Sequence, residues 1–559
     1  MNDRACTAHV DTFARENLPP TEEWPEFLFE VPELQYADRV NAAVALLDDA
    51  LARGWGERTA ILAPTSSDAT TLLRWSYAEL HARANRIARV LTEDMGVVPG
   101  NRVLLRAPNS PMHAACWFGV IKAGAIAVGT MPLLRARELT EIVGKAQISH
   151  ALCDARLAQE LEAARTRCPS LREVAFFGAG GADDLCTHMA KKPATFTAVD
   201  TARDDVALIA FTSGTTGKPK GTVHFHRDLL AICDCWPRSM LRARPDDVFT
   251  GSPPLAFTFG LGGLLLFPLR IGAATLLLEQ AAPDALLPAI ARHRATVLFT
   301  APTSYRAMAA HAREHDLSSL RKCVSAGEAL PGPTRALWKE VTGIEIIDGI
   351  GSTELLHIFI SHDEAHARPG ATGRPVPGYR ACVMDDAGRV LPPGRIGRLA
   401  VKGPTGCRYL ADDRQRQYVR DGWNYTGDAY LVDDEGYFVY QARTDDMIIS
   451  AGYNIAGPEV ESALLLHPAV AECGVIGAHD EERGQIVKAY VVLKPGYSAG
   501  DAMTHALQTF VKDTIAPYKY PRAMRYLAAL PRTETGKLQR FRLRQIDAEE
   551  RASQAKGAS

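Results

Sequence analysis

The stretch Phe211-Thr-Ser-Gly-Thr-Thr-Gly-Lys-Pro-Lys-Gly221 is the most informative part of the sequence. An apolar run, Ala207-Leu-Ile-Ala-Phe211, leads directly into a loop of glycine and hydroxyl residues that ends in two lysines. Glycines let backbone N–H groups approach oxygen anions, hydroxyls add donors, and a lysine adds positive charge. The spacing differs from the GxxxxGK[ST] pattern of P-loops, so we predict a phosphate-binding loop of another kind. Its candidate ligands are Thr212, Ser213, Gly214, Thr215, Thr216, Gly217 and Lys220.

Composition narrows the class of protein. The chain has 559 residues, 47% of them hydrophobic and 23% charged, which is ordinary for a globular protein with more than one domain. The net charge of -2 argues against a nucleic-acid partner, which would call for a basic excess. The most apolar stretch, residues 255–269, is punctuated by glycines and a proline and is shorter than the ~20 residues that span a bilayer. We expect buried core and pocket wall there, and no membrane partner.

Cysteine usage and the N-terminus bear on the compartment. The 11 cysteines are scattered, without a CxxC pair or a histidine cluster at metal-ligand spacing, so we expect neither disulfides nor structural zinc. The first 20 residues lack the apolar segment of a secretion signal. The sequence therefore predicts a cytoplasmic protein.

Periodicity predicts the fold class. Short apolar runs such as residues 101–106 alternate with helical patterns such as residues 77–91, which indicates an α/β protein with largely parallel sheets. The strand-like residues 436–440 are followed by a polar, hinge-like segment, residues 441–446. After it comes a compact stretch with βαβ-like signals of its own.

We place a domain boundary at Asp445, which gives an N-terminal domain of residues 1–444 and a C-terminal domain of residues 445–559. The tail after Leu543 carries little apolar content, and we expect it to fray.

Five further segments follow the phosphate loop in order. They are Ser325-Ala-Gly-Glu-Ala-Leu-Pro331, Asp348-Gly-Ile-Gly-Ser-Thr-Glu354, Tyr425-Thr-Gly-Asp428, Arg443-Thr-Asp-Asp-Met-Ile448 and Pro531-Arg-Thr-Glu-Thr-Gly-Lys537. Together the six segments resemble the signature of the adenylate-forming superfamily of acyl-CoA synthetases, luciferases and peptide-synthetase adenylation domains. The resemblance implies a large N-terminal domain of β-sheets and helices and a small, mobile C-terminal α+β domain. It also implies an enzyme that activates a carboxylic acid with ATP and passes the acyl group to a thiol.

The resemblance assigns roles in the nucleotide site. Thr353 would contact the α-phosphate, and Glu354 would hold a Mg²⁺ ion, a hard cation that prefers carboxylate oxygen. Asp428 would accept hydrogen bonds from the ribose hydroxyls, with Arg443 donating beside it. The remaining nucleotide residues that the resemblance implies are Ala326, Gly327, Glu328, Asp348, Gly349 and Ile350.

The C-terminal domain is expected to serve both half-reactions. Lys537 would neutralise the charge that develops when a carboxylate approaches the α-phosphate, so Lys537, Thr353 and Glu354 are the expected catalytic residues. The resemblance makes Asp445 the hinge about which the domain turns. It places coenzyme A beside Ser450, Gly452 and Tyr453, where a glycine leaves room for the thiol. Ala442 and Gly457-Pro458 depart from the common family pattern.

The acid pocket is predicted from two aromatic, glycine-punctuated segments, residues 254–262 and 355–359. The run from Gly351 to Phe359 looks like the benzoate-CoA ligase branch, and the whole chain, including residues 17–27, looks most similar to 2-aminobenzoate-CoA ligases. The expected pocket residues are Ala256, Phe257, Phe259, Gly260, Gly327, His357 and Ile358. The resemblance thus implies conversion of a benzoate-type acid to its CoA thioester, with ATP, Mg²⁺ and coenzyme A as cofactors and co-substrates.

Three alternatives stay open at this point. One is a standalone adenylation enzyme that loads an aryl acid onto a carrier protein, and another is a CoA ligase for a different small acid. A non-catalytic ligand-binding protein with this fold would have no use for Lys537, which argues against that class. The ring substituent of the acid and a homodimer are also open.

Overall fold

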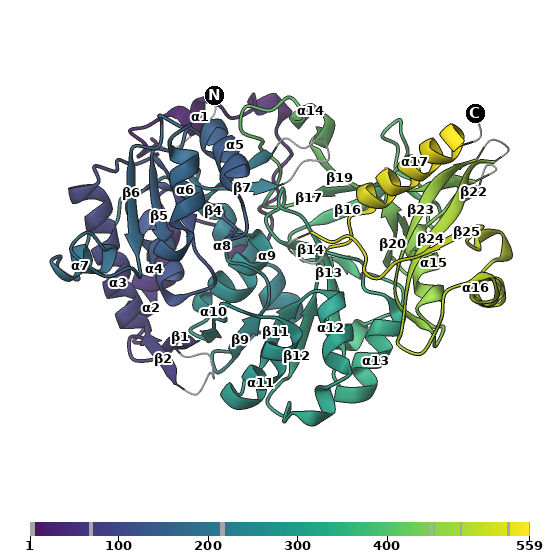
Figure 1. Cartoon of the computed structure of the whole chain (residues 1–559). Coiled ribbons are helices and arrows are strands. Elements are labelled where there is room, and N and C mark those ends of the chain that lie inside the picture. The colour runs from purple at the N-terminus through teal and green to yellow at the C-terminus, as the bar shows by residue number, and fades with distance from the viewer. Residues whose placement is uncertain are drawn as a thin grey trace.

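The structure is a computed structural model that describes residues 6–65, 71–212, 219–444, 446–450, 453–480, 483–533 and 537–557. Within these residues the strands form four sheets, three in a large N-terminal body and one in a smaller C-terminal lobe (Figure 1). The structure therefore has the α/β class and the large-plus-small organisation that the sequence predicts.

The first sheet has six strands, and its neighbouring strands are parallel except for the last pair. In spatial order they are β6 (Glu173–Phe177), β5 (His150–Asp154), β3 (Arg102–Arg106), β4 (Ile126–Thr130), β7 (Val206–Thr212) and β8 (Lys220–Phe225). Every residue of β3 and β5 is buried, because helices cover both faces of a parallel sheet. Each of the two strands has an apolar centre, Val103 to Leu105 and Ala151 to Cys153, and its polar end residues are buried as well.

The second sheet has nine strands, with a parallel run from β1 to β13 and antiparallel strands at both edges. In spatial order they are β15 (Arg374–Pro375), β14 (Ile358–Ser361), β13 (Ile346–Gly351), β12 (Lys322–Ser325), β11 (Val297–Thr300), β9 (Val248–Gly251), β10 (Ala274–Leu276), β1 (Thr59–Pro64) and β2 (Leu72–Ser76). The carboxyl ends of β9, β12 and β13 lie at one edge, where open α/β sheets bind ligands.

The third sheet corrects the expectation of largely parallel sheets, because all its pairs are antiparallel. Its strands are β16 (Arg380–Met384), β17 (Gly397–Lys402), β18 (Val419–Arg420), β19 (Trp423–Val432) and β20 (Phe438–Arg443). Short connections join several neighbours, and a connection too short for a crossover helix permits only antiparallel pairing. Strand β20 also extends through Arg443, so the segment expected to be hinge-like, residues 441–446, begins inside a strand.

Helices of the N-terminal body flank these sheets. They are α1 (Phe13–Glu16), α2 (Asp49–Ala52), α3 (Tyr77–Arg89), α4 (Pro111–Lys122), α5 (Ala136–Ala146), α6 (Ala158–Arg165), α7 (Leu185–Ala190), α8 (His226–Asp234), α9 (Thr258–Leu261), α10 (Phe267–Arg270), α11 (Pro283–His293), α12 (Pro302–Ala309), α13 (Gly332–Thr342) and α14 (Gln415–Tyr418). Helix α3 begins as its sequence predicts: the Ser76 hydroxyl accepts from the Glu79 N–H, and the Glu79 carboxylate accepts from the Ser76 N–H.

The apolar stretch 255–269 forms α9, a π-helical segment (Gly262–Leu266) and α10, all largely buried. The prediction of buried core there is confirmed. Within the described part of the chain, no helix combines the length and apolar composition that crossing a membrane requires.

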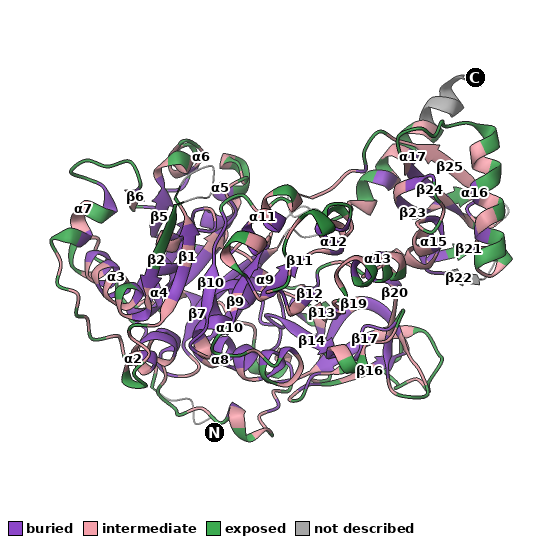
Figure 2. Ribbon diagram, turned by 90° about the horizontal axis from the view of Figure 1, so that it is seen from below, coloured by how far each residue is buried: buried purple, intermediate pink, exposed green. Residues whose placement is uncertain are grey.

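The C-terminal lobe packs helices on a sheet of its own. The strands are β22 (Tyr453–Ile455), β21 (Ile448–Ser450), β24 (Gly484–Leu493), β23 (Val470–Asp480) and β25 (Ala523–Tyr526), and the helices are α15 (Gly457–Leu464), α16 (Asp501–Thr514) and α17 (Arg540–Gly557). Figure 2 shows buried residues concentrated in the strands of the N-terminal body and a separate buried layer inside the lobe. The lobe's apolar clusters contain no described residue before Ile448.

Helix α17 corrects the expectation that the tail after Leu543 frays. Leu543 is 0% exposed and packs in a cluster with Ile476 and Tyr490. Lys488 Nζ donates to the carboxylates of Asp547, at 2.8 Å, and Glu550, at 2.9 Å. One buried leucine and these ion pairs anchor a helix whose composition gives only a weak amphipathic signal.

Candidate functional site

The phosphate loop joins β7 to β8, which pair antiparallel. Thr212 and Lys220 are register partners across this hairpin, so they face each other at the mouth of the loop. The Thr212 hydroxyl is buried and has no hydrogen-bond partner in the described residues. The predicted ligands Ser213, Gly214, Thr215, Thr216 and Gly217 lie outside the described residues.

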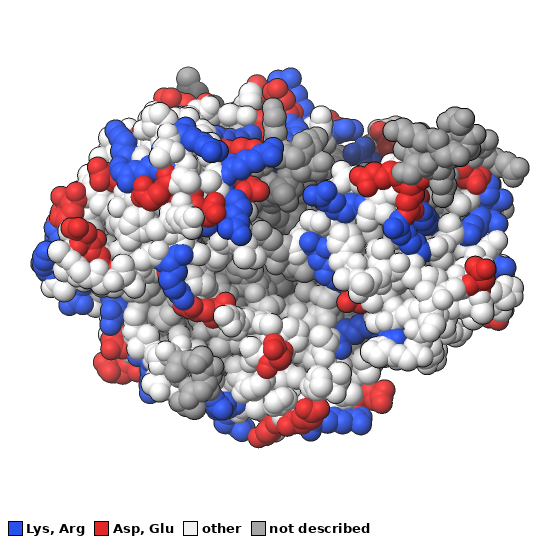
Figure 3. Space-filling view, in the orientation of Figure 1, with Lys and Arg blue, Asp and Glu red and all other residues white. Residues whose placement is uncertain are grey.

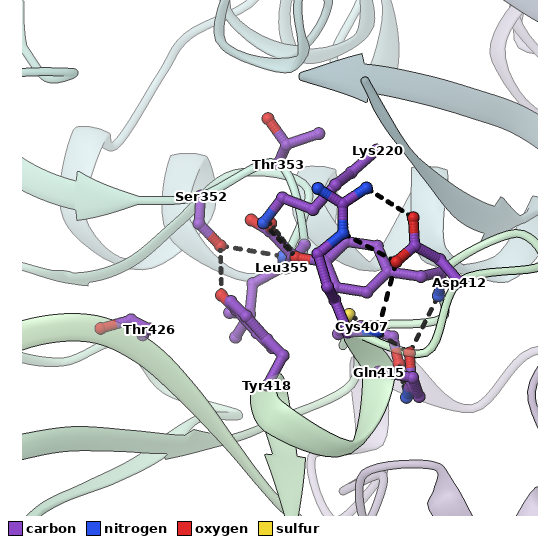
Figure 4. Close-up of polar contacts among 12 residues, drawn as sticks. Lys220, Ser352, Thr353, Leu355, Cys407, Asp412, Gln415, Tyr418 and Thr426 are labelled. Carbon is purple, nitrogen blue, oxygen red and sulfur yellow. Dashed lines mark hydrogen bonds and ion pairs between the residues drawn. The ribbon is translucent and has the colours of Figure 1, made fainter. Parts of the chain in front are cut away.

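Lys220 meets Glu354 through a tyrosine that the sequence analysis missed (Figure 4). Lys220 Nζ donates to the Tyr409 hydroxyl at 2.9 Å, and that hydroxyl donates to Glu354 Oε1 at 2.5 Å. Lys220 Nζ also lies 3.7 Å from the same carboxylate oxygen. Tyr409 is 1% exposed, so its ring and hydroxyl are fixed by packing. The loop that supplies Tyr409 is tied down by Gln415, whose side-chain oxygen accepts from the Tyr409 N–H at 2.9 Å.

Glu354 suits a magnesium ion that is shared with a phosphate ligand. Its carboxylate is 10% exposed and faces the end of the phosphate loop at Lys220. Mg²⁺ usually binds one or two protein carboxylates together with substrate phosphates and waters, rather than a closed cage of side chains. Groups of three or more potential metal ligands are not found among the residues that the structure describes. The donor set therefore fits a metal that arrives with a nucleotide.

Thr353 lies on the short connection between β13 and β14. Its carbonyl accepts from His224 Nε2 at 2.9 Å, which fixes the backbone. The neighbouring Ser352 hydroxyl accepts from the Leu355 N–H at 3.2 Å and lies 3.3 Å from the Tyr418 hydroxyl. In Figure 4 the Thr353 side chain points away from these contacts. Its hydroxyl is thereby left for a ligand.

Asp428 and Arg443 are brought together by strand register, since they are partners in the antiparallel pair β19 and β20. Arg443 Nη1 donates to Asp428 Oδ1 at 3.2 Å. Burial raises the pKa of Asp428, and the Arg443 charge opposes that shift. The pair presents a carboxylate acceptor next to a fixed donor, which suits a ligand with vicinal hydroxyls.

The residues around Asp348 are more enclosed than the others. Burial raises the pKa of Asp348 to about 7, with Arg335 opposing. Its N–H donates to His362 Nε2 at 3.2 Å, and its carbonyl accepts from the Ser361 hydroxyl at 2.6 Å. At Gly349 an added Cβ would lie 2.8 Å from the Ile358 side chain, so any larger residue there would force Ile358 to shift.

Lys537 approaches the site from the C-terminal lobe. In Figure 1 the yellow trace before α17 runs from the lobe toward β13 and β14. A Cβ added at Gly327 would lie 3.3 Å from Lys537 Cε, so the lysine stem crosses this glycine. The surrounding protein lowers the pKa of Lys537, and the carboxylates of Glu328 and Asp428 oppose the shift. Part of the Lys537 side chain is exposed to solvent, while desolvation of its ammonium group is the main cause of the lowered pKa.

The face of the molecule shown in Figure 3 is hollowed between the N-terminal body and the lobe, and Lys and Arg side chains border the hollow. The candidate site therefore lies between the two parts of the chain. It is formed by the ends of the phosphate loop, the edge of the second sheet and Lys537. This arrangement suits an anionic ligand.

Four of the predicted acid-pocket residues, Ala256, Phe257, Phe259 and Gly260, follow the carboxyl end of β9, whereas Gly327 follows β12, and His357 and Ile358 follow β13. The backbone of this wall is held by Asn109, which donates to the Pro253 carbonyl at 3.0 Å and accepts from the Leu255 N–H at 2.7 Å. Ala256 and Phe257 line a small cavity, about 10 Å³, on one side of the wall. Gly260 is tightly packed, because an added Cβ would lie 2.1 Å from the Pro254 carbonyl oxygen.

His357 lies among aromatic rings, with its ring 4.5 Å from Phe267 and 5.6 Å from Phe259, centroid to centroid. Burial lowers the pKa of His357 to about 3, so the imidazole is neutral at physiological pH. Neither ring nitrogen makes a well-formed hydrogen bond in the described residues. Buried polar groups rarely lack a hydrogen-bond partner, which makes His357 a candidate contact for a polar ligand atom. The sequence analysis also missed Phe267 and Trp236, which pack against this ring.

The predicted coenzyme A residues lie elsewhere in this structure. Ser450 pairs in register with Tyr453 and accepts from Arg483 Nε at 3.3 Å, both within the lobe. Strand β22 lies at the far edge of the lobe from the N-terminal body in Figures 1 and 2. Gly452 and the expected hinge residue Asp445 lie outside the described residues. The structure thus brings Lys537, and not Ser450, to the nucleotide-site residues.

Two protein families match the chain. The "AMP-binding enzyme" family matches residues 49–409, and the "AMP-binding enzyme C-terminal domain" matches residues 459–537.

Similar proteins of known name agree with these matches. The chain is 36% identical over 520 residues to the benzoate–CoA ligase of Thauera aromatica, covering 92% of this chain and 97% of that protein. It is 32% identical to the 4-hydroxybenzoate–CoA/benzoate–CoA ligase of Rhodopseudomonas palustris, covering 90% of this chain and 94% of that one. Among solved structures it is similar to the anthranilate CoA ligase AuaEII in complex with anthranoyl-AMP, with a TM-score of 0.88 and 34% identity over 93% of this chain and 100% of that one.

Proposed function

Because this chain belongs to the AMP-binding enzyme family, and within it to the AMP-forming acyl-CoA ligases of the benzoate type, we propose that its acid is an ortho-substituted benzoate such as 2-aminobenzoate. The enzyme class predicted from the sequence is confirmed by these relatives. The substrate, the site residues and the domain boundary at Asp445 remain proposals.

In the first step a carboxylate oxygen of the acid attacks the α-phosphorus of ATP and pyrophosphate leaves. The phosphate loop with Lys220 would hold the departing phosphates, Thr353 the α-phosphate, and Asp428 with Arg443 the ribose. Lys537 would offset the negative charge that builds up between two anions, which is a charge problem that needs no covalent enzyme intermediate. Glu354 would hold a Mg²⁺ ion that, when bound, neutralises phosphate charge.

In the second step the thiol of coenzyme A attacks the acyl carbonyl of the adenylate and AMP leaves. Ser450 and the neighbouring Gly452 and Tyr453 would line the thiol's path after the lobe turns about Asp445. The distance of β22 from the nucleotide site in this structure supports that proposal, since these residues need a different lobe orientation to act.

The choice of substrate rests on the neutral imidazole of His357, whose only polar neighbour is a contact with the Phe259 backbone too poorly aligned to count as a hydrogen bond in the described residues. A neutral imidazole has one donor nitrogen and one acceptor nitrogen. An amino group on the ring would donate to the acceptor nitrogen, while the faces or edges of Phe257 and Phe259 contact the aromatic plane. Similarity to a ligase solved with anthranoyl-AMP supports the same substituent.

The test is a substrate panel with ATP, Mg²⁺ and coenzyme A, in which AMP and the thioester are quantified. We expect 2-aminobenzoate and benzoate to be turned over efficiently, and acetate and palmitate poorly, because acetate forfeits the roughly 25 cal/mol per Å² of ring burial and a long chain does not fit a slot for a flat ring. A higher kcat/KM for acetate or palmitate would refute the aryl substrate.

His357→Ala sharpens the same test. We expect the ratio of kcat/KM for 2-aminobenzoate to that for benzoate to fall by about tenfold, as for loss of one buried hydrogen bond, while the KM for ATP stays within about twofold. An unchanged ratio would show that His357 does not read the ring substituent.

A further inference from the structure

The described segments on either side of residues 534–536 pair with each other at a defined base, and together with Lys537 they are called the lysine hairpin here. Arg532 and Leu538 pair across it as antiparallel partners. The Thr533 N–H donates to the Lys537 carbonyl at 2.7 Å, and the Lys537 N–H donates to the Thr533 hydroxyl at 3.0 Å. Whatever holds the two arms at this base also fixes where the lysine side chain points.

Glu328, on the turn after β12, reaches both arms of that base. Leu538 N–H donates to Glu328 Oε1 at 3.1 Å, and Arg532 Nη1 lies 3.9 Å from the same oxygen. The Glu328 side chain is 18% exposed, which protects these contacts from water. Burial raises the pKa of Glu328, and Arg532, the Leu538 N–H and Lys537 each oppose that rise. The carboxylate is therefore surrounded by groups of the lobe that favour its ionised form.

Gly327, the residue before Glu328, also contacts the lysine hairpin. Gly327 has φ +92°, a backbone conformation that favours glycine, and the Lys537 stem passes where its Cβ would be, at 3.3 Å from Cε and 3.7 Å from Nζ. One turn thus makes room for the lysine and holds the base of its hairpin.

We propose that Glu328 is a positioning residue that docks the lysine hairpin for adenylation, and not a ligand of ATP. This inference rests on the proposed function and changes the role that the sequence resemblance gives to Glu328. The contact joins two parts of the chain that must separate if the lobe turns for the thiol step, so its loss affects the first half-reaction alone.

The chain offers a matched control. Arg532 Nη2 also binds Glu472 Oε2, at 2.7 Å, but Glu472 belongs to the same lobe. Glu472→Gln removes a carboxylate from the same arginine without touching the contact between lobe and body. Glu328→Gln keeps an acceptor oxygen and removes the charge, and Glu328→Ala removes both.

The experiment measures each variant in three ways with the full-length protein. Adenylation is followed by acid-dependent ATP–pyrophosphate exchange, and thioester formation by adding coenzyme A to a chemically prepared aroyl-AMP. Hydrogen exchange of the peptide that contains Leu538 is followed in the nucleotide-free protein.

For Glu328→Ala we expect the kcat of exchange to fall tenfold or more, consistent with the loss of a charge-assisted hydrogen bond, with the KM for ATP within about twofold of wild type. Thioester formation should stay within about twofold, and the Leu538 peptide should exchange faster. Glu328→Gln should lie between wild type and Glu328→Ala, and Glu472→Gln should match wild type in all three measurements.

Three results would overturn the proposal: a raised KM for ATP with kcat retained, equal losses in both half-reactions, or unchanged exchange of the Leu538 peptide in Glu328→Ala. Absence of wild-type turnover with every aryl acid would refute the proposed function instead. In that event the hydrogen-exchange comparison of Glu328→Ala with Glu472→Gln still decides whether Glu328 docks the hairpin.

Discussion

Tyr409 separates two groups of opposite charge. Its hydroxyl binds both Lys220 and Glu354, which are otherwise 3.7 Å apart. In Tyr409→Phe we expect Lys220 and Glu354 to form a direct ion pair that competes with the phosphates of ATP. The KM for ATP in pyrophosphate exchange should rise about tenfold while the KM for the acid is unchanged, because a hydrogen bond to a charged group is worth about 1.5–3 kcal/mol.

Tyr418→Phe is the control for that measurement. Its ring packs edge-on against Tyr409, and its hydroxyl lies 3.3 Å from Ser352 rather than on either charged group. It removes a hydroxyl from the same cluster and should leave the KM for ATP near that of wild type. A comparable increase in both variants would mean that general packing, and not the bridge, sets nucleotide affinity.

At the scale of single residues, the sequence predicted candidate site residues that lie within motifs. It missed those that lie outside any motif and reach the site through the tertiary fold. Lys220, Glu354 and Asp428 each stand in a run whose order and spacing are informative. Tyr409 and Trp236 stand in runs without such a pattern, and only the tertiary fold brings them to Glu354 and His357. Neither has a local chemical signature that one sequence alone reveals.

Helix α17 depends on very few buried side chains. Leu543 is 0% exposed, whereas Phe541, two positions earlier, is 48% exposed. We expect Leu543→Ala to lower the free energy of unfolding of the lobe by about 2–5 kcal/mol, because it leaves a cavity between the helix and the sheet. Phe541→Ala should change it by no more than about 0.5 kcal/mol. Chemical denaturation followed by circular dichroism measures both, and equal effects would contradict the packing described for this helix.

The elements that periodicity predicted well are those buried on both faces. Strands β3 and β7 were recognisable because each has a run of buried apolar residues, Val103 to Leu105 in β3 and Val206 to Phe211 in β7. Residues 436–440 were recognised as strand-like, but the antiparallel pairing of the β16–β20 sheet and helix α17 were not, since pairing and packing depend on partners distant in the sequence. Local propensity does not contain that information.

At the scale of the whole molecule, one lysine from the lobe lies against the proposed nucleotide site of the body. Lys537→Ala should reduce acid-dependent pyrophosphate exchange by at least about a hundredfold, since it removes the cation that offsets charge in the first step. Conversion of prepared aroyl-AMP and coenzyme A to the thioester should be nearly unchanged. Similar losses in both half-reactions would show that the lysine has a general structural role.

Among the described residues, the N-terminal body and the lobe have separate apolar cores. The buried clusters of the lobe begin at Ile448, and those of the body end at Phe438, with partly buried Tyr440 packed against them. Hydrogen bonds between the two parts include Arg306 Nε to the Ala471 carbonyl at 3.2 Å and the Leu538 N–H to Glu328 Oε1 at 3.1 Å. If the lobe turned, hydrogen bonds between the two parts would be replaced by hydrogen bonds to water. Neither apolar core would become exposed to solvent. In a two-state equilibrium of this kind, a ligand that prefers one orientation by about 5.5 kcal/mol would move its population from 1:99 to 99:1. The order of the two half-reactions could then be set by which ligand is bound at each stage.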